Sequence, residues 1–552
     1  MERRTYLILP FLLALCRPAL AEPGDVLRLA IEVQGKTEAE NSRVGKITMT
    51  LGDEERSVYL CSRDTAATPV AGFSPASFTA TATSYRGYTF TGFTIGQADC
   101  GTEITAGELT DIGSGATLTA HYTATTGQGI CLWHDYSDDQ RDAYRLPALV
   151  RTRRGRIIAF ADYRPGNTDV GGGPTSIERR YSDDDGRTWS APLRVAQGNW
   201  SDAAANYLEY SFGDAAAVAD NTPGNSGDDI LMVCAGGNKF WPYSFFSDDK
   251  QTPQLGCALW RSADGGKTWG SYTDITPAIM QAFTDAGLRR PEAEDKGIVR
   301  AFFSSGKITQ STRKARGARY NRLYSALVVN GGDAVVYSDD FGATWTVLGG
   351  QMANNGDEAH LVELPDGDLL LVGKSWGSTR WVNVFNYSDF SNAAGQWGQT
   401  GLSNNAVTTT CHGDIEAFVA YDIEGREHTV IVETAPTTNA PQRRNIQYYY
   451  VGVPKTSGFS VHDFAADGEK QVSWSEGMNV TQNWGAYSSL LSKGRGCVDI
   501  LFEECAAGEH QPPTGYCLVY QHHELTDITR GRFFMSKKLA RKAYKSLQTN
   551  KQ

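Results

Sequence analysis

Long apolar runs are scarce in this sequence, and their scarcity excludes one class of protein. Beyond the first residues, no stretch of the 552-residue chain approaches the roughly 20 apolar residues that a membrane helix needs. Positive charge is also in deficit, because 52 Lys and Arg stand against 63 Asp and Glu and give a net charge of −11. This balance argues against nonspecific nucleic-acid binding, although local arginines can still hold a small anionic substrate.

Metal-binding cysteine patterns are missing as well. The chain has ten cysteines, and their spacings match no zinc motif, so no metal site is predicted. One of the ten, Cys16, lies in the expected leader. The nine that remain are an odd number, which leaves at least one thiol without an intramolecular disulfide partner.

The first 21 residues are typical of a secretory signal peptide. Arg3 and Arg4 precede an apolar run from Tyr6 to Leu15, and small residues lead to expected cleavage after Ala21. Lipidation of Cys16 is the alternative, but Leu15 stands where a small residue is expected. We therefore expect a secreted or periplasmic protein, either free or associated with the cell surface.

A repeated pattern, S-x-D-x-G-x-T-W, organises the rest of the chain. It occurs at Ser182 to Trp189, Ser262 to Trp269 and Ser338 to Trp345, with a degraded copy at Ser388 to Trp397. Each of the three full copies, called the boxes below, follows a short run of strand-forming residues and places Gly at the centre of a tight turn. The boxes are interpreted as structural turns of a repeated all-β architecture, most simply a six-bladed β-propeller.

The chain divides into four segments on these patterns. Residues 1–21 are the signal peptide, and residues 22–129 alternate like strands and predict a small β-sandwich. This sandwich is either a carbohydrate-binding accessory or a spacer. Residues 130–535 form the propeller, with one short helix at Thr276 to Ala286. Residues 536–552 form a basic helix or tail, which is solvated or meets a membrane surface.

Propellers have many unrelated functions, so the function must be argued from particular residues. Arg145 lies inside the apolar strand pattern of Tyr144 to Leu149, where a buried arginine needs a partner. Asp169 lies in a glycine-rich loop that follows Asp162-Tyr163-Arg164. Taken alone, Asp169 is most simply a solvated loop residue.

Arg145-Leu146-Pro147 together with the three boxes resembles the secreted bacterial exo-α-sialidases (neuraminidases) with Asp-box repeats. The resemblance extends over roughly Asp135 to Asp527. It implies a six-bladed propeller, three arginines that bind the substrate carboxylate, a tyrosine nucleophile with a glutamate beside it, and an aspartate acid/base.

Matching the family's motifs residue by residue implies a specific site. The implied catalytic residues are Asp169 as acid/base, Glu358 as the partner of the nucleophile, and Tyr487 as the nucleophile. The implied substrate-binding residues are Arg145, Arg164, Asp214, Lys374, Arg443 and Glu503. Among these, Glu503 would brace Arg145, and Arg444 is a rival of Arg443.

Lys374 departs from the family pattern, which has an arginine at this point. Lysine keeps the charge but lacks the planar fork that binds a carboxylate at two places. Either Lys374 is a weaker clamp, or the nearby Arg380 takes the role, or the ligand differs.

The residue types suit the chemistry of a sialoside, whose anomeric carbon carries a carboxylate. A neutral tyrosine avoids the repulsion that a carboxylate nucleophile would meet, about 4 kcal/mol at about 4 Å and an effective dielectric near 20. Tyrosine is a poor nucleophile until a neighbouring base accepts its proton, which Glu358 would do.

The sequence therefore predicts a retaining exo-α-sialidase that hydrolyses terminal sialic acids from glycoproteins, glycolipids and oligosaccharides. The reaction would use a tyrosine-linked intermediate and neither a metal nor an organic cofactor. The predicted partners are sialylated glycans, without nucleic acid or a membrane span. The alternatives are a trans-sialidase, a hydrolase of a related nonulosonic acid, and a catalytically weak sialic-acid-binding lectin.

Overall fold

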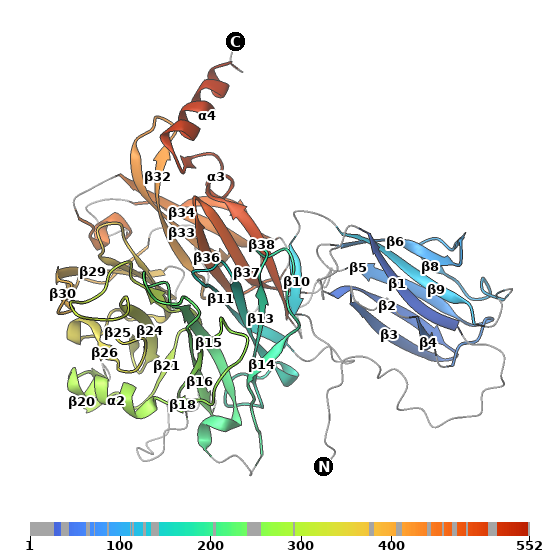
Figure 1. Cartoon of the computed structure of the whole chain (residues 1–552), viewed down its shortest axis with the longest axis horizontal. Coiled ribbons are helices and arrows are strands. Elements are labelled where there is room, and N and C mark those ends of the chain that lie inside the picture. The colour runs from blue at the N-terminus through green and yellow to red at the C-terminus, as the bar shows by residue number, and fades with distance from the viewer. Residues whose placement is uncertain are drawn as a thin grey trace. The chain divides into compact units, whose positions relative to one another are not determined.

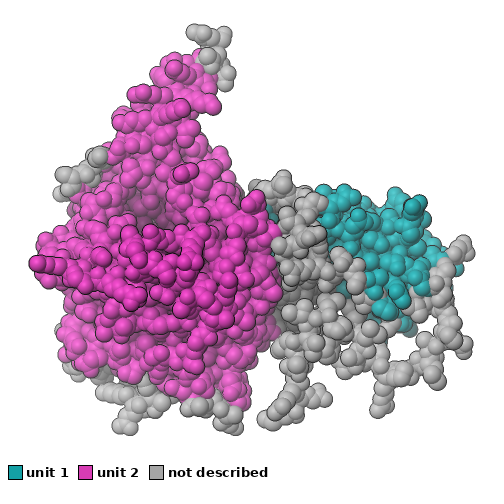
Figure 2. Space-filling model, viewed as in Figure 1, with its two compact units in different colours: residues 1–131 teal, residues 132–552 magenta. Residues whose placement is uncertain are grey.

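The structure is a computed structural model of the whole chain (Figure 1). It describes residues 27–34, 43–61, 67–70, 72–84, 88–110, 112, 115–124, 129–133, 143–201, 206–239, 255–290, 293–374, 380–403, 411–438, 443–454, 458–465, 472–481, 484–505 and 516–549. The expected signal peptide and most of the expected linker lie outside these residues. The chain forms two compact units, Met1–Cys131 and Leu132–Gln552 (Figure 2).

The first unit is a β-sandwich, as predicted. One sheet has the order β4-β1-β9-β6-β7 and the other the order β3-β2-β5-β8. β1 and β9 pair in parallel, and the other strand pairs are antiparallel. The strands are β1 (Leu27–Gln34), β2 (Arg43–Leu51), β3 (Glu54–Cys61), β4 (Thr68–Val70), β5 (Thr79–Ser84), β6 (Tyr88–Ile95), β7 (Ala98–Asp99), β8 (Glu103–Ile104) and β9 (Thr117–Ala124).

Alternation along these strands builds the core of the sandwich. Val44, Ile47, Phe78, Phe93 and Leu118 are fully buried, while many of their strand neighbours are partly exposed. This period of two is the pattern of a sheet with one covered face.

The second unit is a β-propeller, and its described residues form six sheets of four or five strands and one hairpin. In chain order the sheets contain β11 (Ala143–Arg151), β12 (Ile157–Arg164), β13 (Ser176–Ser182) and β14 (Leu193–Ala196); β15 (Phe212–Ala219), β16 (Ile230–Gly237), β17 (Leu255–Ser262), β18 (Thr273–Asp274) and β22 (Gly306–Lys307); β21 (Ala301–Phe303), β23 (Thr309–Gln310), β24 (Leu323–Val329), β25 (Gly332–Ser338) and β26 (Thr346–Val347). The remaining three contain β27 (Asp357–Glu363), β28 (Leu369–Lys374), β29 (Arg380–Asp389), β30 (Ala394–Trp397) and β31 (Gly401–Leu402); β32 (Ile415–Asp422), β33 (Glu427–Pro436), β34 (Ile446–Pro454), β35 (Ser475–Asn479) and β39 (Phe533–Phe534); and β36 (Ser488–Gly494), β37 (Cys497–Cys505), β38 (Tyr516–Glu524) and β10 (Ile130–Trp133).

The innermost strands close the sheets into a ring. β11 contacts β15, β15 contacts β21, and β24, which pairs with β21, contacts β27; β27 contacts β32, β32 contacts β36, and β36 contacts β11. The last sheet is completed by β10, which precedes the first sheet in the sequence. Two distant parts of the chain are thereby joined in one sheet.

Helices are few. In the described part of the chain the α-helices are α2 (Thr276–Asp285), α3 (Leu525–Ile528) and α4 (Lys537–Thr549), and the hairpin is β19 (Arg289–Arg290) with β20 (Ala293–Gly297). α2 and α4 occupy the two stretches where the sequence predicts helix. Among the described residues, no helix combines the length and the apolar character needed to cross a bilayer.

The three boxes form the same turn, between the third and fourth strands of their sheets. In each, the Ser hydroxyl donates to the Asp carboxylate at 2.8 or 2.9 Å and accepts the Gly N–H, and the Asp accepts the Thr hydroxyl at 2.6 Å. The box glycines, at 186, 266 and 342, have φ of 88°, 78° and 79°, which a side chain would strain. The turns predicted from the pattern are confirmed, and their polar groups serve the fold.

Replacing a box aspartate should therefore destabilise the propeller in a pH-dependent way. Burial opposes ionisation of Asp264, but hydrogen bonds from Thr268, Ser262 and Lys267 outweigh it and lower its pKa to about 2. Asp264→Ala should cost about 1 kcal/mol at pH 7, since solvent screens this partly exposed group. The pKa of Asp264 is lower in the folded than in the unfolded chain. The loss in free energy of unfolding caused by the substitution is therefore complete above about pH 4 and shrinks as the pH falls toward 2. Denaturant melts at several pH values measure this, with exposed Lys267→Ala as the control; an equal loss at pH 2 would contradict it.

Candidate active site

Three predicted site residues, Arg145, Asp214 and Glu358, lie at or beside bulges in the innermost strands. β11 is irregular between Arg145 and Ala148, β15 between Gly213 and Ala216, and β27 between Asp357 and His360. Within these bulges Leu146, Asp214 and Glu358 have φ of 51°, 57° and 48°. Left-handed backbone at residues other than glycine costs of order 1 kcal/mol or more and concentrates at functional sites. The bulges re-aim these side chains at the start of each strand.

Glu503 holds Arg145 and the backbone of Tyr487 in one arrangement. Its Oε1 accepts from Arg145 Nε and from the backbone N–H of Leu146, both at 3.0 Å, and its Oε2 accepts from Arg145 Nη2 at 3.3 Å and from the N–H of Tyr487 at 3.2 Å. Glu503 is fully buried. Burial opposes the charge of Arg145, but Glu503 outweighs it, so the pKa of the guanidinium is raised well above its ordinary value.

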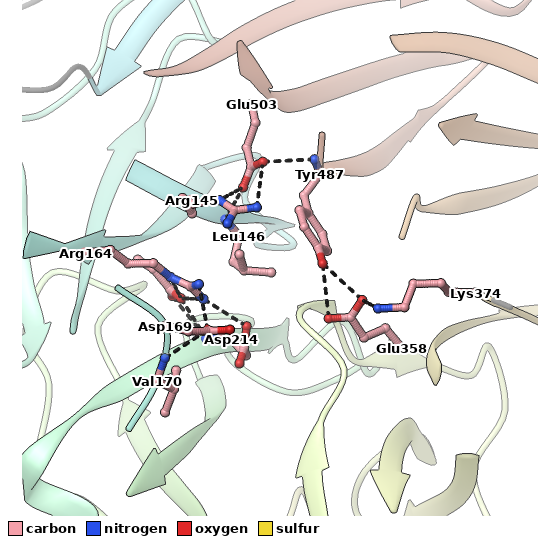
Figure 3. A network of polar contacts seen from close by, with 11 residues as sticks. Arg145, Leu146, Arg164, Asp169, Val170, Asp214, Glu358, Lys374, Tyr487 and Glu503 are labelled. Carbon is pink, nitrogen blue, oxygen red and sulfur yellow. Dashed lines mark hydrogen bonds and ion pairs between the residues drawn. The ribbon is translucent and has the colours of Figure 1, made fainter. Parts of the chain in front are cut away.

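Tyr487, Glu358 and Lys374 form a continuous chain of contacts (Figure 3). The Tyr487 hydroxyl donates to Glu358 at 3.2 Å to Oε2 and 3.4 Å to Oε1, and Lys374 Nζ lies 2.7 Å from Oε2. Burial and the charge of Glu358 raise the pKa of Tyr487 above its ordinary value. Burial opposes ionisation of Glu358, yet Lys374 and Arg443 outweigh it and lower its pKa. The pair is therefore a neutral phenol beside an ionised carboxylate.

A second group of charges gathers around Arg164. Its guanidinium lies 2.8 Å from Asp169, 2.8 Å from Asp162 and 3.3 Å from Asp214. Asp162 and Asp214 have side chains that are 0% and 14% exposed, whereas Asp169 is 47% exposed and is the one open to a ligand. Burial raises the pKa of Asp214 well above its ordinary value, despite Arg164.

The two groups face a common space. In Figure 3 the Arg164, Asp169 and Asp214 group lies opposite Tyr487 and Glu358, with Arg145 and Leu146 between them. The centre of the Tyr487 ring is 5.3 Å from the Arg145 guanidinium carbon and 5.6 Å from that of Arg443. The structure thus brings together all nine residues that the resemblance implied, from positions 145 to 503.

The structure separates the rival arginines. Arg444 stacks on Trp484 at 4.0 Å, while Arg443 lies over the Tyr487 ring. Arg380 is fully buried with its Nε 3.0 Å from Glu433, in the neighbouring sheet. Lys374, in contrast, contacts the carboxylate that Tyr487 contacts.

Sequence reasoning missed several residues of this site. Asp162 is enclosed between Arg164 and the N–H of Asp214, and only its position two residues before Arg164 hints at this. Cys411 is buried beside Tyr487 and Leu146, and burial raises the pKa of its thiol.

A buried histidine pair behind Tyr487 was also missed. The ring of His412 lies 5.2 Å from the Tyr487 ring, and its Nε2 contacts Nε2 of His360, whose Nδ1 is 3.2 Å from Asp414. Burial and His360 lower the pKa of His412 well below its ordinary value, so this ring is neutral. No local pattern signals the pair, because its members come from separate strands and loops.

The carboxylates of this site are committed to arginine and lysine, which leaves them poor ligands for a metal ion. Asp162, Asp169 and Asp214 converge on Arg164, and Glu358 is held by Lys374. Among the described residues, a group of three metal-ligating side chains occurs elsewhere, at Cys497, His522 and Glu524.

Comparison with known proteins agrees with the resemblance to sialidases. No protein-family profile matches the sequence. A sialidase of Micromonospora viridifaciens is 31% identical over 234 residues, which are 41% of this chain and 32% of that protein. A sialidase of Bacteroides fragilis is 24% identical over 375 residues, which are 67% of this chain and 61% of that protein. The chain is a relative of the bacterial sialidases.

Solved sialidase structures share the fold of this sialidase relative. The Hadza microbial sialidase Hz136 superposes with a TM-score of 0.50 at 16% identity, covering 92% of this chain and 93% of that chain. The NanB sialidase from Streptococcus pneumoniae has a TM-score of 0.52 at 14% identity, covering 90% of this chain and 94% of that chain. At these identities the likeness concerns the fold.

Proposed function

We propose that the protein is a retaining exo-α-sialidase that cleaves terminal sialic acids from glycans through a covalent intermediate on Tyr487. The observation that carries the proposal is the hydrogen bond of Tyr487 to Glu358, flanked by Arg145 and Arg443 and facing Asp169. A buried neutral phenol next to an ionised base is the arrangement that nucleophilic catalysis needs.

The cations of the site would orient the substrate. Arg145, Arg443 and Lys374 surround Tyr487, and guanidinium groups bind carboxylates in pairs of charge-assisted hydrogen bonds. Glu503 supports this because it fixes the Arg145 fork before the substrate arrives. The sugar carboxylate would thereby hold its anomeric carbon over the Tyr487 oxygen.

The reaction would then run in two steps. Tyr487 attacks the anomeric carbon, Glu358 accepts its proton, and Asp169 protonates the departing glycosidic oxygen. Asp169, now ionised, removes a proton from water, which attacks the same carbon, while Glu358 returns its proton to the departing Tyr487 oxygen. Two inversions give net retention of configuration.

The expected anomer tests this proposal. A sialoside incubated with the enzyme inside an NMR tube should release the α-anomer first, before mutarotation. Initial appearance of the β-anomer would contradict a retaining mechanism. The same assay with excess galactoside acceptor separates hydrolysis from transfer, and no turnover across several linkages would favour a lectin.

Export through the predicted signal peptide belongs to the same proposal, since glycan substrates lie outside the cell.

Lys374→Arg should tighten the substrate clamp. An arginine offers two donors to the carboxylate where lysine offers one point charge. We expect the apparent KM to fall by about fivefold, which corresponds to about 1 kcal/mol. Steady-state kinetics of the variant measure this.

Arg380→Ala is the control for that prediction. It would leave Glu433 buried without its partner, so the melting temperature should fall while KM is unchanged. An unchanged KM in Lys374→Arg together with a large rise in Arg380→Ala would transfer the clamp to Arg380.

A further inference from the structure

Four polar side chains gather on one face of the sheet that closes the propeller ring. In the pairing of β37 with β38, Cys497 lies opposite Glu524 and Asp499 lies opposite His522. Residues two apart on a strand share a face, so both cross-strand pairs point the same way. Cysteine spacing along the sequence does not reveal this group, because its members meet only through strand register.

Three of these side chains converge on one point. Cys497 Sγ is 3.2 Å from Glu524 Oε1, His522 Nε2 is 3.8 Å from the same oxygen, and all three atoms lie within 4.8 Å of one another. A tetrahedral zinc ion with bonds of about 2.0–2.3 Å holds its ligand atoms about 3.3–3.6 Å apart. The Sγ to Oε1 distance is close to this range, and the Nε2 to Oε1 distance exceeds it slightly.

Asp499 supplies the second contact that metal-binding histidines usually have. Its Oδ1 lies 2.9 Å from His522 Nδ1, and its side chain is fully buried. A proton on Nδ1 shared with Asp499 leaves the Nε2 lone pair directed to the ion. Lys493, 3.0 Å from Asp499, balances the charge of this carboxylate.

We propose that Cys497, His522 and Glu524 bind one divalent transition-metal ion, with zinc as the natural occupant and water in the fourth position. Thiolate, imidazole and carboxylate together suit zinc rather than calcium or magnesium. The Cys497 thiol proton passes to solvent as the metal–sulfur bond forms. His522 and Glu524 are exposed, so an ion reaches the site from solvent.

The ion's role is structural. Cys497 begins β37, and Glu503 follows six residues later along that strand, about 20 Å away in extended backbone. The ion therefore joins the ends of β37 and β38 without touching Arg145 or Tyr487. This sheet also contains β10, so the clamp strengthens the sheet that closes the ring.

The test uses full-length protein freed of metal with a chelator. Calorimetric titration with zinc chloride should show one ion per chain, and cobalt(II) should give a thiolate-to-metal charge-transfer band. Zinc should raise the melting temperature and leave sialoside hydrolysis unchanged. Cys497→Ser, His522→Ala and Glu524→Gln should each abolish the cobalt band and the thermal shift, while Asp499→Asn should weaken binding about 10- to 100-fold.

His121→Ala is the matched control, since His121 is another partly exposed histidine beside a carboxylate, 3.2 Å from Glu32. It should bind metal like the wild type. The proposal is overturned if wild-type protein binds no zinc, or if the thermal shift persists in both Cys497→Ser and Glu524→Gln. Circular dichroism of each metal-free variant separates lost binding from lost fold.

Discussion

Tyr487→Phe should lower sialoside hydrolysis at least about a thousandfold, because the change removes the attacking oxygen and nothing else. The ring remains to pack against His412 and Arg145, so the melting temperature should shift little. The loss should appear in kcat, since the cations that bind the carboxylate are untouched. Steady-state kinetics with a fluorogenic sialoside, together with a thermal melt, measure both effects.

Tyr516→Phe is the matched control for this variant. Tyr516 also packs against the Arg145 guanidinium, at 5.1 Å, but its hydroxyl has no contact with Glu358 in the described part of the chain. We expect a change of less than about tenfold. A Tyr516 variant as inactive as the Tyr487 variant would show that tyrosine packing on Arg145, rather than nucleophilic attack, explains the loss.

Asp169→Asn should show an effect that depends on the leaving group. General acid catalysis contributes about 10²- to 10⁴-fold, and a natural sugar leaving group needs it fully. An activated aryl sialoside needs little protonation, so its first step should survive while the second step, which needs a base, slows. The aryl substrate should therefore give a burst of phenol followed by a slow steady state, which stopped-flow absorbance records.

Asp214→Asn is the control that separates the acid/base role of Asp169 from a general effect of charge near Arg164. Asp214 faces the same guanidinium but is buried, and burial raises its pKa. Its replacement should alter KM without any leaving-group dependence. Equal losses on natural and aryl substrates in Asp169→Asn would argue against the acid/base assignment.

The sequence predicted those parts of the fold that local chemistry determines. The boxes were readable because Ser, Asp, Gly and Thr interact within seven residues of one another, as at Ser182 to Thr188. The short α2 was readable from Thr276-Pro277 at its start. The parallel pairing of β1 with β9 and the addition of β10 to the last sheet were not, because both join segments that no local pattern connects.

The candidate site followed from a resemblance rather than from spacing. Arg145 and Glu503 are separated by 358 positions, and only closure of the ring brings them within hydrogen-bond distance. Where no motif existed, prediction failed: Asp162, Cys411 and the pair His360 and His412 were found only through their contacts. The strained φ of Glu358 was equally hidden, since nothing in its sequence requires a left-handed backbone.

The central claim is that Tyr487 is the nucleophile, and covalent trapping tests it most directly. A mechanism-based fluorinated sialoside slows the second step, so the sugar should remain attached to the enzyme. Peptide mapping by mass spectrometry should then find the label on Tyr487 in the wild type and no label in Tyr487→Phe. A label on Glu358 or Asp169, or a Tyr487→Phe variant that is still labelled, would contradict the account.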